Sequence, residues 1–258
     1  MEDKPRLVHN ALMLIKKIGR FAKEKGLLSV IYFGARTVAL LPVYLYFKAF
    51  KSQSVFELDG HKYKYFYMLP SNKDWLHERC VEIPIVWRLV NKYHGKEILE
   101  VGNVLSNYFH ISHDVLDKYE HADGVINEDV VGYKPSKKYD LIVSISTLEH
   151  VGFEETPPES KKIVRAIDNL KSLLVLGGEL VVTLPVGFYN HEHRIHELCG
   201  LISDGTIKFD KLYCLKRKAR VKWVESTWDN VKDLKFNSPF PAANGLLVGY
   251  IRKSTEVV

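Results

Sequence analysis

Glu97-Ile-Leu-Glu-Val-Gly-Asn-Val-Leu-Ser106 is the stretch that decides the fold, because an apolar run ends here in an acidic residue and a glycine. A second apolar run, Tyr139-Asp-Leu-Ile-Val-Ser-Ile145, lies further along the chain. A third, Gly177-Gly-Glu-Leu-Val-Val-Thr-Leu-Pro185, follows a long amphipathic stretch. Apolar runs that alternate with amphipathic stretches predict an open, mostly parallel sheet with helices on both faces.

Periodicity and turn signals give the expected elements around these runs. The predicted strands cover residues 97–102, 113–117, 124–127, 139–145, 179–184, 208–216 and 245–252. The predicted helices cover residues 75–93, 160–176 and 190–202. Residues 53–69 alternate in polarity around Asp59-Gly60, which predicts a β-hairpin before the sheet begins.

The N-terminal region differs from the rest of the chain and is expected to form a helical extension over residues 1–52, followed by the main domain at 53–258. Residues 6–25 have the spacing of a basic amphipathic helix. Residues 27–47 are apolar but contain Gly34, Arg36 and Pro42, which favours a broken apolar hairpin. Residues 6–47 could lie on a membrane surface, cover the domain as a helical lid, or form a dimer contact. A spanning helix is less favoured, because a central arginine costs roughly 2.5–3.5 kcal/mol on insertion.

Composition excludes few classes of protein by itself. The chain has 258 residues, is 46% hydrophobic and carries a net charge of +6, with a pI near 9.0. Its basic residues gather in two clusters, at 16–25 and 211–222, and nothing between them resembles a nucleic-acid-binding motif with interleaved aromatic residues. The three cysteines, Cys80, Cys199 and Cys214, are widely separated, which suits a reducing cytoplasm.

The order and spacing of these segments resemble a class I S-adenosylmethionine (SAM)-dependent methyltransferase over about residues 75 to 252. The segment Leu148-Glu-His-Val151 resembles the small-molecule branch of the ubiquinone and menaquinone biosynthesis type. The resemblance implies a Rossmann-like, seven-stranded sheet whose last strand is antiparallel, and SAM as the cofactor. The glycine loop is degenerate, since Val104 and Ser106 stand where the family has its second and third glycines.

The cofactor-side residues are expected at the carboxyl ends of the strands, where ligands bind in open parallel sheets. Gly102 allows close approach of the backbone, and Glu100 could orient the loop or the amino group of the cofactor. Asp117, with Asp114 as the alternative, could accept both ribose hydroxyls, and Asp129 stands where the family contacts adenine. The cofactor-binding set is Glu100, Gly102, Asn103, Asp117, Asp129 and Ser146.

The acceptor-side residues follow from the same resemblance. His150 could take a proton from an acceptor hydroxyl, since the ordinary pKa of an imidazole suits a base at neutral pH, and Glu149 is its catalytic neighbour. Both could instead only fix the turn after the strand. His191-Glu-His-Arg-Ile-His-Glu197 has no partner ligands at metal spacing elsewhere, so no metal site is expected. The candidate substrate-binding residues are Tyr189, Asn190, Glu78, Arg79 and Glu82.

The sequence therefore predicts SAM-dependent methyl transfer to a small-molecule or a glycan or lipid-linked acceptor, at oxygen. The alternative is a non-catalytic methyltransferase-like scaffold, which Val104 and Ser106 favour. An RNA methyltransferase is disfavoured, because Ser144-Ile-Ser-Thr147 replaces the motif that would hold a flipped base. The expected location is the cytoplasm, with a peripheral position on the membrane face left open, and the oligomeric state is not determined.

Overall fold

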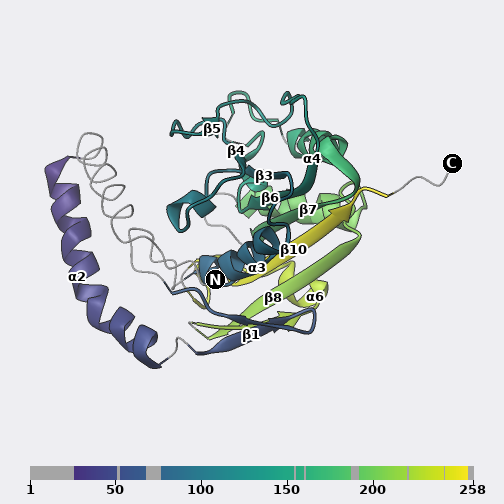
Figure 1. The fold of residues 1–258 in the computed structure, drawn as a ribbon. Helices are drawn as coiled ribbons and strands as arrows, with labels where there is room; N and C mark the ends of the chain where they lie inside the picture. The colour runs from purple at the N-terminus through teal and green to yellow at the C-terminus, as the bar shows by residue number, and fades with distance from the viewer. Residues whose placement is uncertain are drawn as a thin grey trace.

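The computed structural model describes residues 26–50, 53–67, 77–153, 155–159, 161–186, 192–219, 221–240 and 242–254. Within these ranges the main element is an eight-stranded sheet with the strand order β5-β4-β3-β6-β7-β10-β8-β9 (Figure 1). Its strands are β3 (Ile98–Val101), β4 (Asp114–Leu116), β5 (Val125–Ile126), β6 (Tyr139–Ile145), β7 (Leu174–Val186), β8 (Lys211–Ala219), β9 (Lys222–Ser226) and β10 (Gly245–Arg252).

The topology confirms the predicted fold class, a Rossmann-like, mostly parallel sheet. Strands β3 to β7 are parallel, whereas β10 is antiparallel to both β7 and β8. The chain builds β4 and β5 on one side of β3 and then crosses to β6 on the other, so the strand order reverses between β3 and β6. Such a switch point leaves a crevice at the carboxyl ends of the strands.

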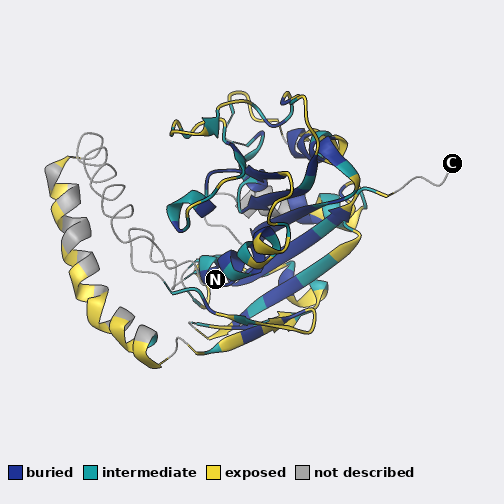
Figure 2. Cartoon of the chain, in the orientation of Figure 1, coloured by how far each residue is buried: buried dark blue, intermediate teal, exposed yellow. Residues whose placement is uncertain are grey.

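Each face of the sheet has its own buried core (Figure 2). One core packs α4 (Lys162–Leu173) and α5 (Glu192–Ser203) against one set of strand residues, including Ile142. The other packs α3 (Arg79–Lys92) and the hairpin of β1 (Val55–Leu58) and β2 (His61–Lys64) against the alternate set, including Leu141 and Val143. Strands covered on both faces are apolar at most positions, which explains the near-continuous apolar runs of the sequence.

Two details differ from the predicted elements, and a third agrees with them. The sheet has an eighth strand, β9, which pairs antiparallel with β8 at the edge. Gly177-Gly178 does not start a strand, because β7 already begins at Leu174 and the glycines fall at a bulge in its pairing with β6. The hairpin is confirmed, with Asp59 and Gly60 both at positive φ between β1 and β2.

Helix α2 (Leu27–Phe50) lies apart from the sheet in Figure 1. It is one continuous helix, so the predicted break at Gly34 and Pro42 is wrong; Pro42 is accommodated inside it. The ring of Phe47, near the end of α2, contacts Tyr67 with the centroids 6.2 Å apart. No helix among the described residues has both the length and the apolar content needed to cross a membrane. The predicted helix at 6–25 falls outside the described residues.

Candidate functional site

A cleft of about 600 Å³ opens at the carboxyl ends of β3, β4 and β6, at the switch point of the sheet. It brings together four residues that the sequence analysis singled out, Gly102, Asp117, Asp129 and His150. Each follows a different strand, namely β3, β4, β5 and β6. The remaining lining residues are Val101, Leu116, Lys118, Tyr119, Glu120, Glu128, Val130, Thr147, Val151 and Glu155.

The loop after β3 is held by Glu100, whose side chain is fully buried. One carboxylate oxygen accepts hydrogen bonds from the backbone N–H groups of Val104, at 2.9 Å, and Leu105, at 2.7 Å. The other lies 2.9 Å from Nε2 of His113. Glu100 therefore orients the loop, and its carboxylate does not face the cleft.

Gly102 adopts a φ of +87°, and a Cβ at this position would lie 2.2 Å from Oγ1 of Thr147. Only glycine fits there, because the backbone is left-handed and the loops after β3 and β6 touch. The loop continues into a 3₁₀ turn at Leu105–Asn107, in which the Ser106 hydroxyl donates to the Asn103 side chain. The residues that replace the expected glycines thus build a compact turn beside the cleft.

Asp117 lies at the end of β4 and faces both the cleft and the neighbouring backbone. Its carboxylate accepts from the N–H groups of Asn103, Tyr119 and Glu120, at 3.1, 2.9 and 2.8 Å. Asp117 thereby joins the two loops that form this wall. The alternative residue, Asp114, lies at the other end of β4 and binds Lys137 and Tyr139, so it does not line the cleft.

Asp129 forms an ion-pair network at the β4–β5 end of the cleft. Its Oδ2 accepts from Lys118, at 2.9 Å, and from Lys162, at 2.5 Å. Both lysines also bind Glu155. Partial burial opposes ionisation, but the hydrogen bonds from the two lysines hold the pKa of Asp129 at about 2. The carboxylate is therefore charged and already engaged with protein cations.

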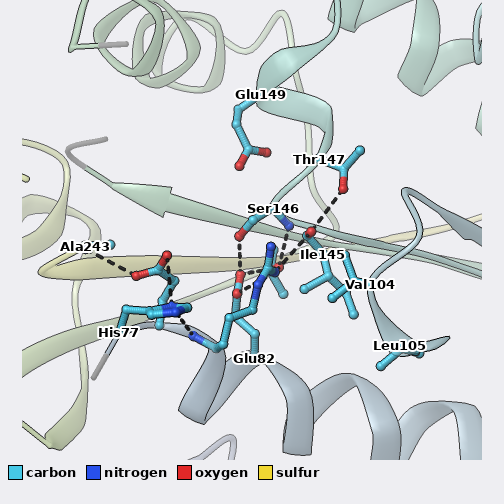
Figure 3. Close-up of polar contacts among 12 residues, drawn as sticks. His77, Glu82, Val104, Leu105, Ile145, Ser146, Thr147, Glu149 and Ala243 are labelled. Atoms are coloured by element: carbon cyan, nitrogen blue, oxygen red, sulfur yellow. Dashed lines mark hydrogen bonds and ion pairs between the residues drawn. The ribbon is translucent and has the colours of Figure 1, made fainter. Parts of the chain in front are cut away.

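A buried polar cluster supports the turn after β6 (Figure 3). Glu82 of α3 is fully buried, and its Oε1 accepts from the hydroxyls of Ser146, at 2.5 Å, and Thr183, at 2.7 Å. Its Oε2 accepts from Arg79 at 2.9 Å, and the same guanidinium nitrogen donates to the carbonyl of Ile145. Ser146 has a φ of +43°, which only a few non-glycine residues adopt. Glu82 and Arg79 thus fix a strained turn and do not line the cleft.

Glu149 points toward the same cluster in Figure 3 and is 1% exposed. Burial raises the pKa of Glu149 to about 8, and the charge of Glu82 adds to the rise. Its carboxyl group is therefore mainly protonated at neutral pH. His150, in contrast, lines the cleft with 30% of its side chain exposed, and its Nε2 lies 3.9 Å from Glu149.

Glu78 lies at the start of α3 and accepts from the backbone N–H of Ala243 at 3.2 Å. Burial opposes its ionisation, yet the hydrogen bond and charge of His77 hold the pKa of Glu78 below its ordinary value. Glu78 thus connects α3 to the segment before β10. Tyr189 and Asn190 lie outside the described residues.

Four residues of this region were not predicted from the sequence. The sequence pattern predicts Thr183 to be an ordinary strand residue and Lys162, on α4, to be a lysine on the helix surface. Thr147 and Lys118 are next to residues that were singled out, so their positions carried a usable signal. Among the described residues, no group of three or more His, Cys, Asp and Glu side chains is placed to hold a metal ion.

Comparisons with known proteins give no family for this chain. No family model and no curated protein matches it. Among solved structures it is similar to the N-methyltransferase NodS from Bradyrhizobium japonicum WM9 in complex with S-adenosylhomocysteine, at 14% identity and a TM-score of 0.38 over 66% of this chain and 84% of that one. A possible histamine N-methyltransferase from Thermotoga maritima has 14% identity and a TM-score of 0.38 over 69% of this chain and 98% of that one. These scores are below 0.5, so the geometry of the cleft is the better guide to function.

Proposed function

We propose that this chain is a SAM-dependent methyltransferase and that SAM binds in the cleft at the carboxyl ends of β3, β4 and β6. One observation carries the proposal: Gly102, Asp117, Asp129 and His150, from four separate strand ends, line a single cavity of about 600 Å³. Cavities of roughly 300–1,000 Å³ are typical of small-molecule and cofactor sites.

The residues present fit a nucleoside cofactor. Gly102 has no Cβ, so the methionine part can approach the backbone of the β3 loop. Asp117 already accepts three backbone hydrogen bonds, and a carboxylate has about four acceptor positions, which leaves one for a ribose hydroxyl. The segment at Glu128 and Asp129 would then face the adenine. When bound, SAM supplies an electrophilic methyl group on its sulfonium.

On the acceptor side, His150 is the titratable residue best placed for proton transfer, since it lines the cleft and keeps partial contact with solvent. It takes the proton of an acceptor hydroxyl as the oxygen attacks. Glu149, buried behind His150, helps to hold the His150 imidazole in position. The Leu148–Val151 segment supports an acceptor of the small-molecule class, and a glycan or lipid-linked substrate belongs to the same proposal. We place this reaction in the cytoplasm.

Isothermal titration of the full chain with SAM and with S-adenosylhomocysteine tests the proposal. We expect the Asp117→Ala variant to bind about 10- to 100-fold more weakly, since a hydrogen bond to a charged group contributes roughly 1.5–3 kcal/mol. Asp114→Ala is the matched control, because it removes a carboxylate from the same strand outside the cleft. Circular dichroism of both variants separates loss of binding from loss of fold.

A non-catalytic scaffold is the second candidate, and a specific observation favours it. The backbone N–H groups of Asn103, Val104 and Leu105 already donate to protein carboxylates, so they are not open to a ligand. An absence of SAM binding by the wild-type chain at millimolar concentration would establish this candidate and refute the enzyme. Equal affinity of Asp117→Ala and Asp114→Ala for SAM would refute the contact assigned between Asp117 and the ribose.

A further inference from the structure

Helix α2 has many exposed positions (Figure 2), and its exposed side chains include large apolar ones. Among the positions of α2 whose side chains the structure describes, every exposed one is apolar. Leu28 is 82% exposed, Val38 is 69% exposed and Phe50 is 73% exposed. Monomeric proteins rarely expose contiguous apolar surface of this kind unless it binds a partner or a membrane.

The exposed residues follow the geometry of one helix face. Steps of three and four residues place side chains on the same side of a helix. The face extends over most of the length of α2, which for 24 residues is about 36 Å. It includes Leu28, Ile31, Ala35, Val38, Pro42 and Leu45.

The sheet domain contacts α2 on a different side. Phe47 is half-buried and packs against Tyr67. At about 100° of rotation per residue, the direction of Phe47 from the helix axis differs by 100° or more from the directions of Val38 and Leu45. The contact therefore lies on a side of the helix away from the apolar face.

The charge of the chain complements an anionic partner at this end. The first 50 residues carry nine Lys and Arg against three Asp and Glu, a net charge of +6 that equals that of the whole chain. Residues 51–258 carry 28 of each sign and are neutral. The charged residues of α2 itself, Arg36 and Lys48, are both positive.

From these observations we propose that α2 docks this protein on the surface of an anionic lipid bilayer. The apolar face enters the boundary between headgroups and acyl chains, and the net positive charge of residues 1–50 favours anionic lipid. Tyr46, exposed near the end of α2, suits the interfacial zone that tyrosine prefers, and the exposed Phe50 adds to the apolar surface.

A second copy of the chain fits the face less well. Coiled-coil seams are flanked by residues of both signs that form interhelical ion pairs, and α2 contains no acidic residue. Its exposed surface is also wider than a seam, since Ala39, Leu41 and Tyr46 are exposed beside the stripe. A bilayer needs neither complementary charges on the helix nor a narrow stripe.

Co-sedimentation of the full chain with lipid vesicles tests this proposal. We expect the protein to bind vesicles of equal parts phosphatidylglycerol and phosphatidylcholine, and to bind pure phosphatidylcholine much more weakly. The double variant Val38→Glu with Leu45→Glu should lose about tenfold or more in partitioning, because it places two like charges in the apolar boundary. Leu176→Glu, at an exposed leucine of β7, is the matched control and should bind as the wild type does.

Two results would overturn the proposal. One is wild-type protein that stays in the supernatant with anionic vesicles. The other is a wild-type dimer in light scattering that the double variant abolishes, with no vesicle binding, which would assign the face to a second copy. Neither readout involves SAM, so the outcome is independent of the proposed reaction.

Discussion

The two ends of the cleft use carboxylates in opposite ways. Behind the β6 end, Glu82 and Glu149 are almost completely buried, and the Glu82 carboxylate binds two hydroxyl groups and Arg79. At the β4–β5 end, Asp129 and Glu155 lie near the surface, where Lys118 and Lys162 neutralise them. Burial raises the pKa of Glu149, whereas the lysines lower the pKa of Asp129. We infer that the first end fixes the structure of the site and that the second adjusts its charge.

The largest effect is expected from Glu82→Ala. This change removes the partner of a mostly buried guanidinium and the acceptor of the buried Thr183 hydroxyl and the part-buried Ser146 hydroxyl. Breaking such a buried ion pair costs about 3 kcal/mol or more. Urea unfolding of the full chain measures it. Glu82→Gln, which keeps an acceptor oxygen, should cost less, and Glu57→Ala, at an exposed position of β1, should cost under about 0.5 kcal/mol.

If Glu82→Ala cost no more than Glu57→Ala, the β6 end would not be structural and the comparison would fail. The steady-state kinetics of the milder variant, Glu82→Gln, give a second test. Because Glu82 holds the strained turn at Ser146, which precedes His150, Glu82→Gln should lower the turnover number more than it raises the KM for SAM.

The next effect is a pH dependence of stability that comes from Glu149. Its pKa is raised to about 8 in the folded chain, against 4.5 for a free glutamate, so the folded state binds a proton that the unfolded state has released. Stability therefore falls as the pH rises from about 5 to about 8, by at most about 1.4 kcal/mol per pH unit. Glu149→Gln removes this loss and should be more stable than the wild type at pH 8.

The measurement is the difference in unfolding free energy between wild type and variant across that pH range. Glu155→Gln is the matched control from the other end of the cleft. The pKa of Glu155 is lowered by Lys118 and Lys162, so its contribution is lost only as the pH falls through acid values. Its difference curve should be flat between pH 5 and 8. A flat curve for Glu149→Gln as well would show that the two ends do not differ in this respect.

Much of the fold was predictable, because strands buried on both faces leave short apolar runs separated by amphipathic stretches. The edge strand β9 was not, since its Lys222-Trp-Val-Glu-Ser226 is largely polar and resembles a loop. The continuity of α2 was missed for a related reason. A glycine and a proline weaken a helix locally, but they do not outweigh the long apolar sequence around them.

The residues that line the cleft were predictable from the sequence, whereas the partners of its carboxylates were not. Residues at strand ends must meet at one edge of a parallel sheet, so grouping Gly102, Asp117, Asp129 and His150 needed only the strand positions. Which group a buried carboxylate binds depends on contacts across the fold. Glu82 reaches Thr183 from 101 residues away, and Lys162 reaches Asp129 from 33. No local pattern encodes such partners, so both acids looked like ligand contacts.

The smallest effect is expected from Lys118→Ala at the β4–β5 end. Lys118 is about one-third exposed, and Lys162 still pairs with Asp129 and Glu155 when it is removed, so the unfolding free energy should change by less than about 1 kcal/mol. The consequence should appear in ligand preference. SAM carries one positive charge more than S-adenosylhomocysteine, and loss of a lysine from the wall of the cleft leaves that wall more negative.

We therefore expect Lys118→Ala to shift the ratio of the affinities for SAM and S-adenosylhomocysteine a few-fold toward SAM. The shift should shrink in high salt, because Lys118 is partly exposed to solvent. Parallel titrations with both ligands measure the ratio, and Lys137→Ala, a lysine of similar exposure paired with Glu97 and Asp114 outside the cleft, is the control. A large loss of stability with an unchanged ratio would make Lys118 a structural residue like Glu82. The distinction between the two ends of the cleft would then rest on burial alone and not on function.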